Sequence, residues 1–368
     1  MTKAAELAKM GEVLTNSQIG GRRNIIINGA MQIAQRGTSV SSLGGTNNDY
    51  QTVDRFKIIG GTAISGRVTM SQSDSGLSGF KKSLKLQVTT ADTSIASGEL
   101  FGISQAIEGQ DLQQLKKGTS DAEQVTLSYY VKGNAAANYT VEISDADNTR
   151  HNTQSFSVTT DWTRVVHTFA ADTTGALDND NATSFQIAWW LHAGSDFNGG
   201  TFTENTWASR TNANRVDSND TSFFDSTDRT FEITGVQLEV GSTATPFEHR
   251  SFGEAKRLCQ RYYREFGGDS TNDALFAGMW YSATTVYCPV QLLPHMRAAP
   301  TVSRKTTNSS DFFMFGVGFS DNADQAVGSN IRHNNFRFYM VGGTSRTAGH
   351  GTWTQTADGQ AITCDAEL

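Results

Sequence analysis

Apolar and polar residues alternate with a period of two in several short segments before residue 245. Leu84, Leu86 and Val88 alternate with polar neighbours, and residues 125–132 and 185–191 repeat this pattern. Because successive side chains of a strand point to opposite faces, each segment predicts a β-strand with one buried face. Gly, Asn, Asp and Ser separate the segments, which is typical of an antiparallel all-β domain.

Two details refine this prediction. In residues 231–240 the apolar positions change from odd to even across Gly235, and a β-bulge at Gly235 would produce that shift. Only a short segment with Gly and Asn separates residues 125–132 from residues 139–143, so we expect these two strands to form a hairpin.

The pattern changes beyond residue 245. All four prolines lie between residues 246 and 300, which favours a domain boundary at the start of that window. Ser251 and Glu254 then form a capping box, in which the two side chains satisfy free backbone donors at the start of a helix. Apolar residues recur at helical spacing as far as Phe266, and glycines follow as the stop. Residues 269–368 return to strand patterns and predict a second, small β domain.

Composition narrows the classes of function. Lys and Arg number 30 against 37 Asp and Glu, and the net charge of −7 argues against a dedicated nucleic-acid binder. No stretch reaches the roughly 18 apolar residues of a membrane span, and the first residues lack the apolar core of a signal peptide. We expect a protein made without Sec export and without membrane insertion. Its three cysteines, an odd number, fit a reducing cytoplasm better than a disulfide framework.

Recognised catalytic motifs are missing from the sequence. It has no G-x-S-x-G elbow, no H-E-x-x-H helix, no P-loop and no C-x-x-C pair, so we expect no enzymatic activity. A glycosidase needs only two suitably spaced carboxylates, which leave no local signature. Glu99, Glu108 and Asp111 are candidates for such a pair, with ordinary surface carboxylates as the favoured interpretation.

Two acidic loops are candidate sites for a bound metal ion. Residues 145–148 place two Asp and one Asn close together, and residues 178–181 two Asp and two Asn, and their oxygens could bind Ca²⁺. Neither loop fits an EF-hand, and Asp and Asn also form turns, which is the favoured interpretation. We expect no cofactor, with a structural Ca²⁺ as the open alternative.

Strand parity suggests one candidate binding surface. In residues 185–191 the odd positions face the core, which leaves Gln186, Trp190 and His192 on the opposite face. By the same parity Tyr130 faces away from the core on its own strand. Aromatic faces stack on sugar C–H groups while amides bond sugar hydroxyls, so an open face would suit a carbohydrate. The alternative is that another part of the protein or a neighbouring subunit covers this face, since large aromatic rings are usually buried.

Several segments resemble bacteriophage tail fibres and related virion appendages. The most specific runs from Gly235 through Pro246-Phe-Glu-His-Arg250 to Tyr263, and residues 24–38 resemble the opening of the same module. Together the similar segments span roughly residues 24–265. Further pieces of the resemblance are residues 53–56, 105–109, 127–132, 296–302 and 365–368.

The resemblance implies a fold and a role. Its strand order is similar to that of jelly-roll carbohydrate-binding modules, so we expect an N-terminal attachment arm (1–23), a jelly-roll β-sandwich (24–248), a linking helix (249–268) and a C-terminal β domain (269–368). It implies a virion structural protein, assembled in the host cytoplasm as a homotrimer, that contacts other phage tail or capsid proteins through residues 1–23. In the leading hypothesis it is a tail-fibre component that recognises a host glycan during attachment. The alternatives are a purely architectural virion module (head fibre, adaptor or decoration) and, less favoured, a polysaccharide depolymerase.

Overall fold

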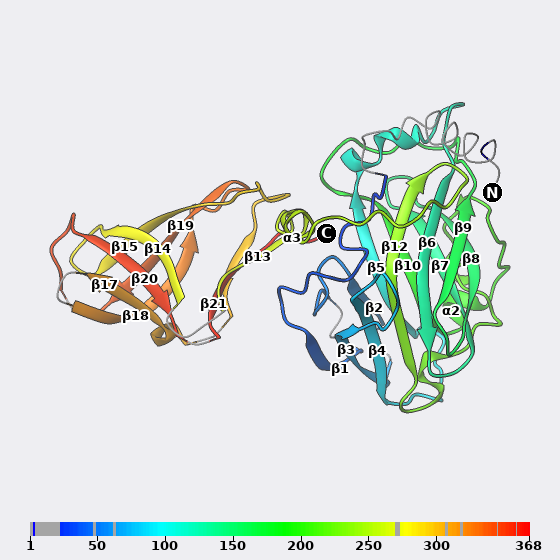
Figure 1. Cartoon of the computed structure of the whole chain (residues 1–368), viewed down its shortest axis with the longest axis horizontal. Coiled ribbons are helices and arrows are strands. Elements are labelled where there is room, and N and C mark those ends of the chain that lie inside the picture. The colour runs from blue at the N-terminus through cyan, green and yellow to red at the C-terminus, as the bar shows by residue number, and fades with distance from the viewer. Residues whose placement is uncertain are drawn as a thin grey trace. The chain divides into compact units, whose positions relative to one another are not determined.

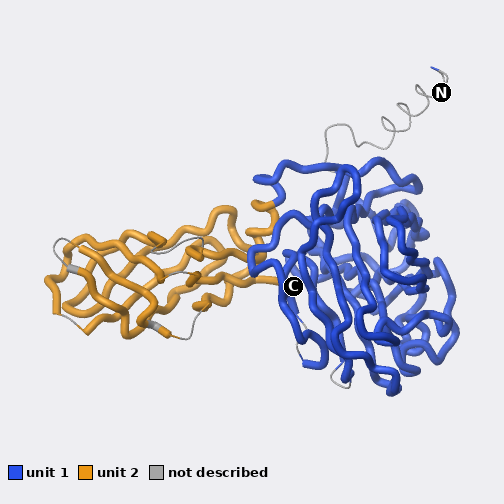
Figure 2. The backbone as a smooth tube through the Cα atoms, turned by 60° about the horizontal axis from the view of Figure 1, so that its bottom comes forward, with its two compact units in different colours: residues 1–255 blue, residues 256–368 orange. Residues whose placement is uncertain are grey.

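The computed structural model describes residues 3, 23–46, 49–61, 64–268, 273–305, 308–316, 319–343, 345–357 and 359–368. The chain divides into two compact units, residues 1–255 and 256–368 (Figure 2). Strands dominate both units, which confirms the all-β prediction (Figure 1). The predicted N-terminal arm lies almost wholly outside the described residues. The division between the units falls within the predicted linking segment, 249–268.

Two six-stranded antiparallel sheets form the first unit, and their inner faces share one apolar core. The strands of sheet 1 are, in spatial order, β1 (Ser39–Leu43), β3 (Arg67–Asp74), β4 (Lys82–Thr90), β12 (Thr230–Val240), β6 (Val125–Gly133) and β9 (Thr163–Phe169). Those of sheet 2 are β11 (Ala208–Ser209), β8 (Arg150–Val158), β7 (Ala137–Asp145), β10 (Thr183–Ala193), β5 (Leu100–Glu108) and β2 (Lys57–Gly60). Two late strands of the unit return to the middle, β10 between β5 and β7 and β12 between β4 and β6. This wrapping makes the unit a jelly roll.

The short helices of this unit lie in its connections. They are η1 (Gly109–Asp111), η2 (Gln113–Leu115), α2 (Ser195–Asn198), η3 (Asn212–Asn214) and η4 (Phe223–Asp225). Within the described residues no helix combines the length and apolar character needed to cross a bilayer.

The core face of β10 agrees with the predicted parity. Phe185, Ile187, Trp189 and Leu191 are all at most 1% exposed. The Trp189 ring lies edge-on to Tyr129 of sheet 1, with ring centroids 5.6 Å apart, so the two sheets meet through aromatic contacts.

The predicted hairpin of β6 and β7 is wrong. β6 pairs with β12 and β9 in sheet 1, whereas β7 pairs with β8 and β10 in sheet 2. Both strands point apolar side chains into the same core, so alternation alone does not distinguish a hairpin from two strands on facing sheets. The hairpin partner of β7 is the next strand, β8.

The second unit is a separate β structure. A closed barrel consists of β14 (Asp273–Trp280), β15 (Thr285–Gln291), β19 (Asn335–Gly342), β18 (Phe319–Ser329), β17 (Phe312–Gly316) and β20 (Gly351–Thr356), and η5 (Ser309–Asp311) precedes β17. A three-stranded sheet contains β13 (Tyr263–Gly267), β21 (Ala361–Asp365) and β16 (Thr301–Arg304). Cys259, Cys288 and Cys364 are buried and free, and burial raises the pKa of the Cys288 and Cys364 thiols to about 12.

The helix after the jelly roll is shorter than predicted. The Ser251 hydroxyl accepts the Glu254 amide, 3.3 Å away, as the capping box requires, and α3 (Phe252–Cys259) follows. However, the helix ends at Cys259, because residues 263–267 pair with the C-terminal strand β21. Tertiary pairing here overrides the helical spacing of the apolar residues.

The predicted bulge at Gly235 is confirmed. The register of β12 against β6 shifts between Thr234 and Gln237, and Gly235 adopts a φ of 62°. A Cβ atom at this position would lie 2.8 Å from the Phe80 ring and 2.9 Å from the Tyr130 ring. Glycine therefore serves both the backbone geometry and the packing of two aromatic rings.

Gly235→Ala should destabilise the protein by more than the roughly 1–3 kcal/mol that a strained left-handed backbone costs, because the two rings must also move. Gly76→Ala is the matched control, since Gly76 has a φ of 68° but open space around its Cβ position. Urea denaturation of both variants measures the difference. Equal losses of unfolding free energy would show that the aromatic packing at Gly235 contributes nothing.

Candidate functional site

The predicted open face of sheet 2 is closed, which corrects the expectation for Trp190 and His192. Each of these side chains is only 2% exposed. Trp190 packs against Phe197 of α2, with ring centroids 5.5 Å apart, and the Arg215 guanidinium lies 4.6 Å from the Trp190 ring centre. Residues 194–225, between β10 and β12, supply this cover, so neither ring is available to stack on a sugar.

The buried carboxylate of Glu142 holds the Trp190 side chain in position. Glu142 accepts hydrogen bonds from Trp190 Nε1 at 2.9 Å, from Arg215 Nη2 at 2.7 Å and from His151 Nδ1 at 3.1 Å. Burial alone would raise the pKa of Glu142, but the His151 hydrogen bond and the Arg215 charge outweigh it and lower the pKa to about 2. The ion pair between Arg215 and the buried Glu142 carboxylate fastens the covering segment, residues 194–225, to sheet 2.

His192 has a comparable structural role. Burial lowers its pKa, so the ring is neutral, with Nε2 donating to Glu99 at 3.0 Å and Nδ1 accepting from Ser222 at 2.8 Å. Ser222 in turn caps η4 by accepting the Phe224 amide. These contacts fasten the end of the covering segment to β10.

Glu99 and Glu108 do not form a glycosidase pair. Glu99 immediately precedes β5 and Glu108 ends it, and nine residues of extended strand separate their backbones by about 30 Å. A pair that flanks a glycosidic bond stands roughly 5–10 Å apart. Glu99 and Glu108 are both buried, and Asp111 lies exposed in η1.

The other two predicted residues have separate positions. Gln186 is partly exposed on sheet 2 and donates to the Ser104 hydroxyl at 3.0 Å. Tyr130 is partly exposed on the outer face of sheet 1, so it lies on the opposite side of the sandwich from Trp190. The four predicted residues therefore do not form one surface.

The first acidic loop is occupied by a side-chain cation. Lys117 Nζ lies 2.6 Å from Asp145 and 3.0 Å from Asp172, and it donates to the carbonyls of Thr174 and Gly175 at 2.8 and 2.9 Å. In the second loop the Asp180 carboxylate accepts the Ala182 amide as in an ordinary turn. No group of three or more His, Cys, Asp or Glu side chains placed to hold a metal ion occurs in the described parts of the chain.

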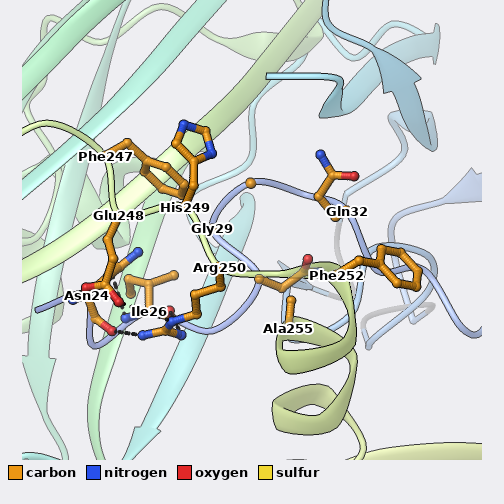
Figure 3. Close-up of a pocket in the computed structure, with 12 residues that line it drawn as sticks. Asn24, Ile26, Gly29, Gln32, Phe247, Glu248, His249, Arg250, Phe252 and Ala255 are labelled. Carbon is orange, nitrogen blue, oxygen red and sulfur yellow. Dashed lines mark hydrogen bonds and ion pairs between the residues drawn. The ribbon is translucent and has the colours of Figure 1, made fainter. Parts of the chain in front are cut away.

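A pocket of about 270 Å³ lies on the first unit where two distant segments of the chain meet (Figure 3). Residues 24–32 form one wall and residues 247–255 the other. In Figure 3 the rings of Phe247 and His249 lie together at one end, and Gln32 and Phe252 lie across from them. Phe252 is 61% exposed, and His249 and Gln32 make no hydrogen bond within the described residues.

Backbone pairing builds this pocket. Beyond the bulge, the first described segment replaces β4 beside β12: Ile25 donates to the Leu238 carbonyl and Val236 to the Gly29 carbonyl, both at 2.9 Å. The Asn24 side chain bonds Val236, Ile26 and Leu238, so it fills the gap that the bulge opens. Arg250 donates to the carbonyls of Asn24 and Ile26 from the opposite wall. The two walls are thereby held at a fixed separation.

An aromatic cluster adjoins the pocket. Phe80 is its buried centre, with ring centroids 5.3 Å from Tyr130, 5.0 Å from Phe247 and 5.3 Å from His249. Phe247 and His249 also pack edge-on at 4.9 Å. The buried Phe80 supports three rings that remain at least partly exposed.

The same face of sheet 1 continues past Tyr130. Lys132 shares the Tyr130 face of β6, and its ammonium lies 5.1 Å from the centre of the partly exposed Trp162 ring and 3.6 Å from Glu232. Trp162 is fixed because its Nε1 donates to the Ser75 carbonyl at 2.9 Å. The residues Gln32, Tyr130, Trp162, Phe247 and His249 are all at least partly exposed, and we call this set the sheet 1 surface.

Sequence reasoning found only Tyr130 of this surface. The signal for Phe247 and His249 was the segment Pro246-Phe-Glu-His-Arg250, an aromatic pair among charges just after the last strand. Both walls of the pocket belong to segments that carry the resemblance to phage appendages, although more than 200 residues separate them. Phe80 and Trp162 lie in loops, where no alternation of apolar and polar residues marks them as part of a surface.

Comparisons with known proteins identify no family. No protein-family model and no curated protein sequence matches the chain. Among solved structures it is similar to a carbohydrate-binding module, CBM4, with 15% identity and a TM-score of 0.31 over 58% of this chain and 97% of that one. A family 11 module from Clostridium thermocellum, in complex with a β-1,3-1,4-mixed-linked tetrasaccharide, has 11% identity and a TM-score of 0.28 over 57% and 99%.

The enzymatically active domain of bacteriophage CBA120 tailspike protein 4 is also similar, with 13% identity and a TM-score of 0.29 over 59% of this chain and 21% of that one. Matches at this level do not define a site. The fold therefore rests on the sheet order and the candidate site on its side-chain contacts.

Glu142→Gln should flatten the loss of stability in acid. A carboxyl group with a folded pKa of about 2 and an ordinary value of 4.5 stabilises the protein above pH 4.5, and this contribution is lost as the pH falls toward 2. The lost contribution is roughly 3 kcal/mol. Denaturant midpoints between pH 2 and 7 measure it, with Glu123→Gln, at a partly exposed carboxylate paired with Lys116, as the control. A variant at Glu142 that keeps the full acid dependence of the wild type would contradict this assignment.

Proposed function

We propose that this chain is a structural component of a phage virion, in a tail-fibre-like appendage, and that its sheet 1 surface recognises a glycan of the host cell. The main support is the sheet 1 surface itself, which presents aromatic faces beside amide and imidazole groups at a pocket. Such a combination suits sugars, because the ring C–H groups stack on aromatic faces while the hydroxyls bond polar side chains. The sequence resemblance to phage appendages supports the assignment to a virion.

The proposed role is binding and not cleavage. The pocket of about 270 Å³ is smaller than the roughly 300–1,000 Å³ of a typical site for a drug-sized ligand. It would accept one sugar unit while neighbouring units lie along Tyr130 and Trp162. Attachment to a cell surface then depends on several weak sites that act together, which suits a homotrimer.

An architectural module is the second candidate. Phe252 favours it, because this ring is 61% exposed at the edge of the pocket, where a neighbouring virion protein could cover it. In that case the aromatic cluster would stabilise an interface between proteins. The proposed attachment through residues 1–23 to other tail or capsid proteins is common to both candidates.

His249→Ala and Tyr130→Leu should each weaken binding to host polysaccharide roughly three- to tenfold, because each removes one ring from the surface. Tyr130→Leu keeps an apolar side chain against Phe80, so both variants should retain the wild-type melting temperature. His350→Ala, at an exposed histidine of the second unit, is the control. Binding is measured by surface plasmon resonance on immobilised polysaccharide, and the recovered polysaccharide should keep its length. Unchanged binding in both variants would reject the sheet 1 surface and favour the architectural module.

The assembled protein should be a trimer. Light scattering at micromolar concentration should give three times the mass of one chain. A constant monomer mass across a hundredfold range of concentration would contradict the trimer and would remove the avidity argument.

A further inference from the structure

The barrel of the second unit has an outer face with an unusual composition. On β15, β19 and β18 the buried side chains point inward, and the outward positions lie in register across the three strands. Only one of these outward positions, Arg337, carries a formal charge. The outward residues are Thr285, Tyr287, Pro289 and Gln291 on β15, Asn335, Arg337, Tyr339 and Val341 on β19, and Gln325, Val327 and Ser329 on β18.

Three side chains on this face form an ordered stack. The Tyr281 and Tyr287 rings are nearly parallel, with an interplanar angle of 19° and centroids 4.3 Å apart. The Arg337 guanidinium lies 4.2 Å from the centre of the same Tyr287 ring. Two groups this close to one ring must occupy its two faces, so the order is Tyr281, Tyr287, Arg337. We call these three residues the tyrosine–arginine stack.

The guanidinium is held in place but is not neutralised. Its Nε donates to the Ser329 hydroxyl at 3.0 Å, and within the described residues the Nη groups make no hydrogen bond and no ion pair. A guanidinium presents its donors in a planar fork that matches a carboxylate. Stacking on Tyr287 limits the conformational freedom that would be lost when an anion binds.

The other end of the stack is apolar and open. Tyr281 is 63% exposed, so burial accounts for little of its ordered position. Its phenol hydroxyl has no hydrogen-bond partner within the described residues. An aromatic face of this kind, with a free hydroxyl at its edge, is suited to stack on the C–H groups of a sugar ring.

We propose that the tyrosine–arginine stack binds an acidic oligosaccharide, with a sugar carboxylate on Arg337 and a second sugar ring on Tyr281. Because Tyr287 separates the two contacts, the ligand has at least two sugar units. Arg337 is the one formal charge among the outward positions that pair in register, since the exposed Asp324 lies in the bulge of β18, and its charge selects an anionic saccharide over a neutral one. This site is independent of the sheet 1 surface and does not rest on the function proposed for it.

Isothermal titration of the full chain with tetragalacturonate tests the proposal, and the same oligosaccharide with its carboxyl groups reduced to alcohols serves as the neutral probe. The wild type should bind the acidic probe, and the neutral probe should bind at least tenfold more weakly. Arg337→Gln should weaken binding of the acidic probe about tenfold or more, and Tyr281→Ala roughly three- to tenfold. Melting temperatures show whether each variant folds, and Arg337→Lys, which keeps the charge without the planar fork, should fall between Gln and wild type.

Two control variants test whether the acidic probe binds at the tyrosine–arginine stack. Arg332→Gln, at an exposed arginine of the same unit, and His249→Ala, on the sheet 1 surface, should leave binding of the acidic probe unchanged. The proposal is overturned by absence of binding at millimolar tetragalacturonate, by equal binding of the two probes, or by normal binding in Arg337→Gln. Sedimentation of the free protein provides a further check: self-association that Tyr281→Ala abolishes would assign this face to a second copy of the chain and would also overturn it.

Discussion

The site in the first unit depends on one backbone constraint, the change of partner along β12. Up to Ile233 this strand pairs with β4, and beyond the bulge its free edge pairs with residues 24–29. Buried backbone groups must find hydrogen-bond partners, and residues 24–29 supply them to β12 through two backbone bonds and the Asn24 side chain, without forming a regular strand. Gly29 permits the contact, since a Cβ atom there would lie 2.0 Å from the Val236 carbonyl oxygen. The bulge thus brings the first described segment to the chain that leaves β12, and the pocket forms between them.

The outer face of sheet 2 is covered, whereas Tyr130 and Trp162 on the outer face of sheet 1 remain partly exposed, and this difference has a physical reason. Sheet 2 carries Trp190 and a buried carboxylate, Glu142, and both need partners that the sheet alone does not supply. The segment after β10 supplies Phe197 for the ring and Arg215 for the charge, and it thereby closes the face. Among the residues that the structure describes, no comparable segment covers Tyr130 and Trp162 on sheet 1. Its rings are fixed by single buried contacts and remain partly exposed, which is why we place recognition there.

Sequence patterns predicted those parts of the fold that depend on local alternation. They located β4, β6, β7, β10 and β12, the core face of β10 and the bulge at Gly235, because each leaves a signal within a few residues. They did not predict that β6 and β7 lie in different sheets, because facing sheets share one core and one parity. They also missed the end of α3, where pairing with a strand about 100 residues later decides the structure.

The candidate site was predictable only in part for the same reason. Strand parity correctly predicted that Trp190, His192 and Tyr130 point away from the core. It does not predict what covers an outward face. The cover over Trp190 comes from a segment rich in Gly, Asn and Ser, with Phe197 and Val216 as isolated anchors. The rings that support Tyr130 come from loops distant in sequence. Resemblance indicated the importance of both pocket walls, yet only the structure placed them together.

Histidine footprinting with diethyl pyrocarbonate tests the central claim most directly, namely that recognition occurs on sheet 1 and not on sheet 2. His151 and His192 are buried beneath the sheet 2 cover, His249 is exposed on the sheet 1 surface, and His295 and His350 are exposed references on the second unit. Our account predicts that the reagent modifies His249, His295 and His350 in the free protein, and that bound host polysaccharide protects His249 while leaving the references reactive. Modification of His192 in the free, folded protein, or unchanged reactivity of His249 in the polysaccharide complex, would contradict it.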